Sequence, residues 1–235
     1  MRAFLETYFD PTNLRLSVPQ VWAGFKTNLE MMAIAEAFVL VLALTLAIVR
    51  GLPGRAASPV RTLAVLYTDV FRGVPLILVA LMLGFGLPQL DAGWISSRPF
   101  LVYGVAALVL VYTAYVTEVY RAGIESVHPS QRMAARSLGL TYTQALRYVV
   151  LPQAIRRVVP PLLNDFIGLQ KDTAIITVIG VVEALNLSQQ FSTDYGSFTG
   201  YTVAALFFIF LTIPLARFTD HLIAERERRE RALAM

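Results

Sequence analysis

Residues 133–152 of the chain read MAARSLGLTYTQALRYVVLP, and this stretch has the pattern of two short helices. Ser130 precedes it and is predicted to cap the first helix, because its hydroxyl can accept a hydrogen bond from a free amide of the first turn. The first helix is then expected over residues 131–138. Gly139 is expected in the left-handed conformation that ends a helix, since glycine has no Cβ to clash there.

The second helix is expected to start at once. Thr141 and Gln144 have the T-x-x-Q spacing of a capping box, in which each side chain bonds the backbone amide of the other residue. Leu146 and Val150 share one apolar face at helical spacing. Pro152 cannot donate to the helical ladder and is expected to stop or kink this helix. The stretch therefore resembles part of a water-soluble protein.

The rest of the chain is too apolar for a soluble domain. Of its 235 residues, 56% are hydrophobic and only 15% are charged. A spanning helix needs about 20 mostly apolar residues. Windows of this kind occur at residues 31–49, 62–84, 100–118, 158–182 and 201–221. We therefore predict an all-α polytopic membrane protein with five transmembrane helices. It is expected to form one domain over residues 1–235, with a core of about 20–225 and its largest loop at 130–152.

Basic residues predict the orientation of the five spans. Thirteen arginines fall in alternate connections and the tail: Arg50, Arg55, Arg61, Arg121, Arg132, Arg136, Arg147, Arg156, Arg157, Arg226, Arg228, Arg229 and Arg231. Only Arg2, Arg15 and Arg98 fall on the opposite side. Because basic residues collect in cytoplasmic loops, the N-terminus is expected outside and the C-terminus in the cytoplasm. The loop at 130–152 is then cytoplasmic.

Several kinds of chemistry are excluded or disfavoured. The chain has no Cys and only two distant His, so we expect no metal site and assign no catalytic residue. Its two lysines follow Phe25 and Gln170, whereas a phosphate-cradling loop needs a lysine after glycine. Ala135 and Gly139 have a spacing found in DNA-binding helix-turn-helix motifs, but spans lie close on both sides. We therefore expect neither ATP nor nucleic acid to bind this chain.

Four motifs resemble a known family. Ala134-Ala135, Gly139, Val149 and Leu151-Pro152 are similar to the cytoplasmic E-A-A-x3-G-x9-I-x-L-P loop of binding-protein-dependent ABC importer permeases. Residues 71–76 (FRGVPL), 118–124 (EVYRAGI) and 171–173 (KDT) are similar to motifs of the polar amino acid subfamily, the histidine and glutamine permease type. The resemblance covers about residues 20–225.

The resemblance implies a fold of the ABC importer permease type (MetI-like) in the bacterial inner membrane. It implies a permease subunit that imports polar amino acids and is not itself an enzyme. The expected partners are ATPase subunits that hold ATP and Mg, a second permease chain (identical or homologous), an extracytoplasmic amino-acid-binding protein and membrane lipid. Residues expected to couple to the ATPase are Gln131, Met133, Ala134, Ala135, Arg136, Leu138, Gly139, Leu151 and Pro152.

Met133 departs from the family motif, which usually has Glu at this position. If Ser130 caps the helix, position 133 is the third helical residue, and a Glu there would complete a capping box. The family Glu would then be partly structural. Alternatively, Glu contacts a basic residue of the ATPase, and this chain pairs with a second permease that retains it.

Polar residues within the spans are the candidates for the substrate path: Arg72, Glu118, Asn164, Lys171, Asp172 and Thr173. Charges in hydrocarbon are costly, so those retained usually face a protein interior or a watery path. The fourth span is interrupted at residues 170–173, and transporters place substrate at such breaks. Arg72 is interpreted as marking a kink, and Glu118 as a gate or a structural ion pair.

Alternatives to the substrate path stay open. In a purely structural interpretation, Lys171 and Asp172 form ion pairs with each other or with Arg72 or Glu118. A different class of function, an ion-coupled secondary transporter or channel, would use Glu118 and Asp172. Residues 186–200 carry no Lys or Arg and are expected as an outer loop, either contacting the binding protein or simply exposed.

Overall fold

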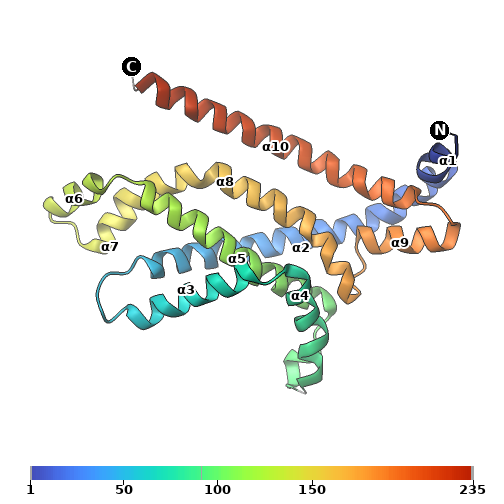
Figure 1. The fold of residues 1–235 in the computed structure, drawn as a ribbon, viewed down its shortest axis with the longest axis horizontal. Helices are drawn as coiled ribbons and strands as arrows, with labels where there is room; N and C mark the ends of the chain where they lie inside the picture. Colours follow the sequence, from blue (N-terminus) through green and yellow to red (C-terminus); the bar gives the residue numbers. More distant parts are fainter. Residues whose placement is uncertain (1, 91, 234–235) are drawn as a thin grey trace.

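The computed structural model describes residues 2–90 and 92–233, and all regular elements within them are helices (Figure 1). The α-helices are α1 (Arg2–Phe9), α2 (Pro11–Arg50), α3 (Ser58–Gly73), α4 (Leu76–Leu81), α5 (Phe100–Ser126), α6 (Pro129–Ser137), α7 (Tyr142–Ala145), α8 (Leu151–Asp172), α9 (Ala184–Tyr195) and α10 (Thr199–Leu233). Tighter or wider turns form η1 (Met82–Gly86), η2 (Leu87–Leu90), η3 (Gly93–Ile95), η4 (Leu146–Val150) and η5 (Thr173–Ile179).

The long helices α2, α3, α5, α8 and α10 run in alternating directions (Figure 1). Three helical stretches are long and apolar enough to cross a membrane: Ala3–Arg50, Phe100–Ser126 and Thr199–Glu225. Two bent pairs raise the number of spans to five if each pair counts as one. The predicted all-α membrane class is therefore confirmed, and five spans stays a prediction.

The second predicted span, residues 62–84, is not a single helix with a kink. Helix α3 ends at Gly73, and the following stretch Leu76–Leu90 is turned by 102°. Figure 1 shows α4 and the turns after it projecting sideways from the bundle. Val74 and Pro75 have extended backbone between the two helices. Pro75 has no amide hydrogen for the ladder, and it restricts the residue before it to extended conformations, so the helix stops here.

The fourth predicted span, residues 158–182, is interrupted where the polar run occurs. Helix α8 ends at Asp172, and η5 continues as a tighter 3₁₀ turn to Ile179. Gly180 then adopts φ +87°, and α9 follows at 54° to the preceding stretch. Residues 186–200 were expected to form a loop, but most of them form α9. That expectation was wrong, because Phe191 of this polar segment is a fully buried anchor.

The main core lies between α2 and α5. Every fourth residue of α2 from Met31 to Ala47 is buried, so this helix presents one narrow stripe to the bundle. Three residues of the stripe are alanines, and small residues let helices in a membrane approach closely. Gly123 of α5 serves the same purpose against α8, since a Cβ there would lie 2.2 Å from Val158. A second core joins α2, α9 and α10 around Val21 and Phe25.

Candidate coupling loop and translocation path

The turn between α6 and α7 has the local geometry that its sequence predicts. Gly139 adopts φ +86°. Its amide donates to the Arg136 carbonyl (3.0 Å), and the Leu140 amide donates to the Ala135 carbonyl (3.2 Å). These two bonds form the Schellman arrangement that closes a helix C-terminus. The Thr141–Gln144 capping box is also confirmed, with bonds of 2.8 and 3.3 Å.

The start of α6 differs from the prediction. The cap is His128, whose Nδ1 accepts from the Ser130 amide at 3.2 Å, and Pro129 is the first helical residue. A proline fits there because its missing amide hydrogen has no helical partner in any case. Ser130 is therefore not the cap, and Met133 is the fifth helical residue rather than the third. The capping-box explanation of the family Glu is wrong for this helix.

Pro152 does not end the second helix of the loop. The chain continues from α7 through η4 into α8, and Pro152 lies in the first turn of α8. The widened turn of η4 directly precedes it. A local widening of this kind accommodates a proline whose ring would otherwise clash with the preceding turn.

The residues predicted to couple to an ATPase lie on α6, in the turn after it and at the start of α8. Met133 is 61% exposed and Leu138 is 83% exposed, while Ala135 is buried against the rest of the protein. Gln131, Ala134, Arg136, Gly139 and Pro152 are also exposed, and Leu151 is partly buried. Helix α6 and its C-cap residue thus expose two apolar side chains, Met133 and Leu138, to solvent. The helix packs against the rest of the protein through the small side chain of Ala135.

The loop is fastened to the end of the bundle by apolar and polar contacts. Val127, Leu146, Val150 and Ala154 form a small core of their own, packed against Ile48 of α2. The Tyr142 hydroxyl also donates to the Gly51 carbonyl at 2.6 Å, across the α2–α3 connection. Motion of α7 would therefore pull directly on the end of α2.

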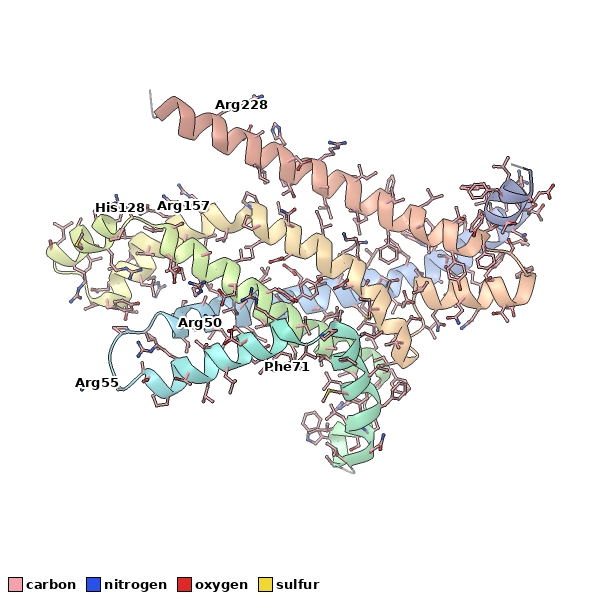
Figure 2. The ribbon with its side chains drawn as sticks, viewed as in Figure 1. Arg50, Arg55, Phe71, His128, Arg157 and Arg228 are labelled. Atoms are coloured by element: carbon pink, nitrogen blue, oxygen red, sulfur yellow. The ribbon has the colours of Figure 1, made fainter. Side chains whose placement is uncertain are left out.

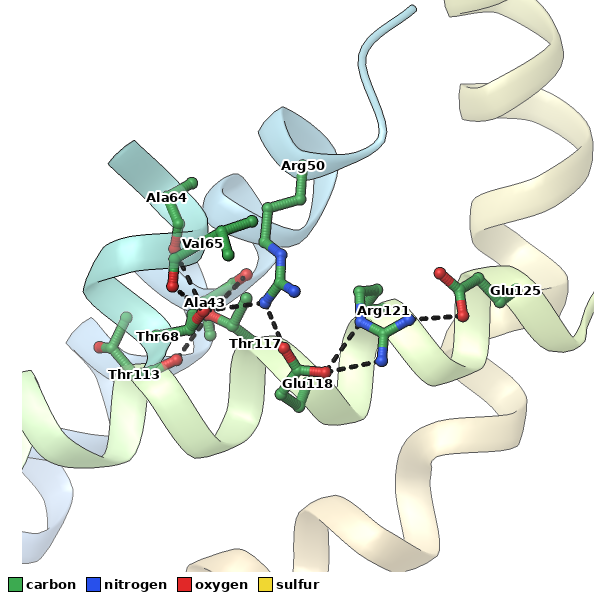
Figure 3. A network of polar contacts seen from close by, with 10 residues as sticks. All are labelled: Ala43, Arg50, Ala64, Val65, Thr68, Thr113, Thr117, Glu118, Arg121 and Glu125. Carbon is green, nitrogen blue, oxygen red and sulfur yellow. Dashed lines mark hydrogen bonds and ion pairs between the residues drawn. The ribbon is translucent and has the colours of Figure 1, made fainter. Parts of the chain in front are cut away.

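A charge network ties α2, α3 and α5 together beside this loop (Figure 3). Arg50, the last residue of α2, donates to Glu118 of α5 and to the Thr68 hydroxyl of α3, the latter at 3.0 Å. Arg121 bonds the second oxygen of Glu118 at 2.8 Å and reaches Glu125 at 2.6 Å. Glu118 is therefore committed to two arginines of its own end of the bundle, and it does not pair with Lys171 or Arg72.

The remaining substrate-path candidates are scattered. Asp172 accepts a hydrogen bond from the Tyr112 hydroxyl at 2.8 Å. No ion pair joins Asp172 to the exposed Lys171 within the described part of the chain. Asn164 and Arg72 are exposed. Thr173 is fully buried and its hydroxyl donates to the Gln170 carbonyl (2.7 Å).

Two polar groupings were not among the predicted site residues. The buried amide of Asn28 donates to Thr173 Oγ1 (3.0 Å) and Glu183 Oε2 (2.9 Å), and its oxygen accepts from the Ala184 amide (3.0 Å). Glu183 also caps α9. Separately, Glu36 of α2 lies near Asp165 of α8, whose Oδ2 is buried and unbonded among the described residues. The only available signal was a lone polar residue in an apolar stretch.

A helical membrane bundle with interrupted spans, buried carboxylates and a capped helix pair at one end defines a transport protein of the permease class. The match to known proteins makes the class specific. The chain belongs to the family of binding-protein-dependent transport system inner membrane components, whose family model matches residues 43–228. It is therefore a multi-pass inner membrane permease subunit, a transport component rather than an enzyme, and members of the family work with an ATPase and a substrate-binding protein.

Relatives and solved structures agree with this assignment. The chain is 37% identical over 209 residues to the probable glutamine ABC transporter permease protein GlnM of Bacillus subtilis (strain 168), covering 87% of this chain and 92% of the relative. It is 30% identical to the glutamine transport system permease protein GlnP of Escherichia coli (strain K12), covering 88% and 93%. A crystal structure of an amino acid ABC transporter with histidines matches at 32% identity and TM-score 0.78, covering 89% and 94%.

A more distant structure supports the fold alone. The inward-facing MetNI methionine ABC transporter matches at 17% identity and TM-score 0.72, covering 87% of this chain and 95% of that one. The predicted MetI-like permease fold is thus confirmed.

Proposed function

We propose that this chain forms, with a second permease chain, the path by which a polar amino acid delivered by an extracytoplasmic binding protein enters the cell. ATPase subunits, which carry the ATP and Mg, dock on α6. The observation that carries the docking site is the exposed pair Met133, on the short helix α6, and Leu138, the residue that caps its C-terminal end. A short capped helix with exposed apolar side chains suits a groove in a partner.

The charge network supports a transport cycle that is driven from the coupling-loop end of the molecule. Arg50, Thr68 and Glu118 join three helices, and Tyr142 connects the coupling loop to the end of α2. A shift of α6 and α7 is thereby transmitted to the bundle through direct bonds. The ion-coupled alternative needs a carboxylate free to bind and release an ion, whereas Glu118 is engaged by two arginines.

The proposed orientation places the N-terminus outside and the C-terminus in the cytoplasm. Its support is the clustering of basic residues. Arg55, His128, Arg157 and Arg228 lie toward the same end of the molecule, while the N-terminus lies at the other (Figures 1 and 2).

For the substrate path we propose Asp172 with Lys171, next to the change from α8 to η5. An amino acid carries an ammonium and a carboxylate, and the Asp172 and Lys171 side chains can bind these two groups respectively. Asp165 and Glu36 add two neighbouring carboxyl groups between α2 and α8. Arg72, Asn164 and Thr173 are assigned supporting positions along the same path.

The proposal is tested by purifying the chain from membranes together with its ATPase and reconstituting the complex in vesicles with the binding protein. Uptake of labelled glutamine, histidine, glutamate and arginine is then measured with ATP and without it. We expect uptake of at least one of these to require both ATP and the binding protein. Uptake that persists without ATP would refute the proposal.

A further inference from the structure

An apolar groove of about 410 Å³ lies between α2 and α3, with α5 as its floor. Its walls include Leu42 and Val49 of α2 and Val60 and Leu63 of α3. Leu42 is 43% exposed and Leu63 is 64% exposed, so the protein itself leaves the groove open along its length. The Tyr67 hydroxyl donates to the Leu110 carbonyl at 2.7 Å and fixes the depth of the floor.

An arginine lies beside each wall at the end of the groove nearest the α2–α3 connection. Val49 immediately precedes Arg50 at the end of α2, and Val60 immediately precedes Arg61 in the first turns of α3. From Val49 to Leu42 the wall reaches about 10 Å deeper along the helix, at 1.5 Å per residue. The groove therefore extends from the basic end of the molecule into its apolar middle.

Two arginines remain available at this opening. Arg50 is turned inward to Glu118, whereas Arg55 stands on the α2–α3 connection and is exposed (Figure 2). Arg61 donates to the Leu52 carbonyl at 2.9 Å, which holds its guanidinium beside the connection. Among the described residues, neither Arg55 nor Arg61 has a carboxylate partner within ion-pair distance. The opening is thus a site of uncompensated positive charge.

We propose that this groove binds one acyl chain of an anionic phospholipid, with the lipid phosphate held by Arg55 and Arg61. The cytoplasmic leaflet is rich in anionic lipid, and basic pockets between spans on that side suit such headgroups. The placement of these arginines in that leaflet rests on the proposed orientation. A second permease chain packed here about a two-fold axis would bring a like-charged arginine pair from each copy onto one interface, which is unfavourable.

The charge component is tested on the complete transporter, purified with its ATPase from mixed phosphatidylcholine and phosphatidylglycerol vesicles. Mass spectrometry counts the phosphatidylglycerol retained per complex. Because one arginine near the surface strengthens anionic lipid binding by about fivefold, the Arg55→Gln/Arg61→Gln variant should retain much less. Arg98→Gln, on an exposed arginine outside this region, is the control and should retain the wild-type amount.

The groove is tested separately with charges intact. Leu63→Trp fills it, and Leu66→Trp is the matched control, since Leu66 is 57% exposed on the same helix but does not line the groove. We expect Leu63→Trp alone to release phosphatidylglycerol at least as strongly as the double arginine variant. Equal phosphatidylglycerol retention by both tryptophan variants would show that the acyl chain does not bind in the groove. Wild-type retention by the arginine variant would show that Arg55 and Arg61 do not hold the lipid phosphate.

A single engineered cysteine tests whether a second permease chain covers the groove. The sequence contains no cysteine, so Leu63→Cys is the only thiol of each permease chain. A disulfide between two Leu63→Cys chains in the assembled transporter would show that a second permease occupies this face and would overturn the proposal. Monomeric chains under the same oxidation support it.

Discussion

Glu118 holds the charge network that joins three helices, because one of its oxygens bonds Arg50, which also bonds Thr68 of α3, and the other bonds Arg121 of its own helix. The side chain of Arg50 is only 13% exposed, so removing its partner leaves a poorly solvated charge. We expect Glu118→Gln to destabilise the permease by about 1.5–3 kcal/mol, the range for hydrogen bonds to charged groups. Thermal unfolding of the purified protein in detergent measures this.

The matched control for Glu118 is Glu125→Gln. Glu125 contacts only Arg121 in the network, and its side chain is 63% exposed. Exposed pairs contribute about 0–1 kcal/mol, so the control should unfold near the wild-type temperature. Equal melting shifts for the two variants would show that Glu118 does not hold the helices together.

Asn28 bonds both Thr173 and Glu183, and it lies in the middle of α2. Asn28→Asp replaces two donated hydrogen bonds by a second carboxylate beside a fully buried one. An uncompensated buried charge costs about 3–5 kcal/mol, so we expect little folded protein. Size-exclusion profiles of fluorescently tagged protein report the folded fraction. Asn13→Asp, in the first turn of the same helix, should behave as wild type, and a normal profile for Asn28→Asp would refute the prediction.

Met133 is a residue at which stability and partner contact can be separated. Because it is the fifth residue of α6, a Glu there completes no capping box. We expect Met133→Glu to change the unfolding free energy of the isolated permease by less than about 0.5 kcal/mol, as for most surface substitutions. Any effect should appear in affinity for the ATPase. A gain of about 1 kcal/mol in stability would restore the structural interpretation of the family Glu.

At the scale of elements, the α6–α7 turn depends on one backbone conformation. Gly139 has φ +86°, and a Cβ built there would meet no atom within 4 Å. A substitution is therefore penalised for its conformation alone, by about 1–2 kcal/mol for ordinary residues and less for Asn or Asp. We expect Gly139→Val to loosen the coupling loop and raise ATP hydrolysis that is not accompanied by uptake.

Gly139→Asn is the matched control, since asparagine tolerates the left-handed region. The ratio of substrate imported to ATP hydrolysed, measured in reconstituted vesicles, should fall for the Val variant and stay close to wild type for Asn. Unchanged ratios in both would show that the turn conformation is not needed for coupling.

Short-range features of the elements could be predicted from sequence, and long-range ones could not. The Thr141–Gln144 box and the left-handed Gly139 depend on neighbours within a few residues, so their spacing is sufficient. The cap of α6 was misplaced by two residues because Ser130 and His128 both offer an acceptor, and Pro129 decided between them. The Asn28–Glu183 bond joins residues 155 positions apart. Pro75 indicates locally that α3 stops, but nothing in the spacing gives the 102° angle of the stretch that follows.

At the scale of the molecule, the orientation can be checked with single thiols, because the natural chain has none. Ala56 in the α2–α3 connection and Asp194 near the end of α9 are both exposed. With a membrane-impermeant maleimide, we expect Asp194→Cys to be labelled in intact cells. Ala56→Cys should be labelled only after the membrane is opened. The reverse labelling pattern would show that the membrane topology is opposite to the proposed one.

Helix α2 is long enough to cross the whole membrane, and its one internal proline, Pro19, lies near its N-terminal end. Its 40 residues measure about 60 Å, roughly twice the hydrocarbon thickness. One end reaches past the membrane surface, Asn28 holds it near its middle, and Arg50 forms the other end. A tilt of about 5° around that middle would displace each end by about 2.6 Å, enough to break the bonds of Arg50. A displacement at the N-terminal end of α2 is thereby transmitted to Arg50 and to the charge network at the opposite end of the bundle.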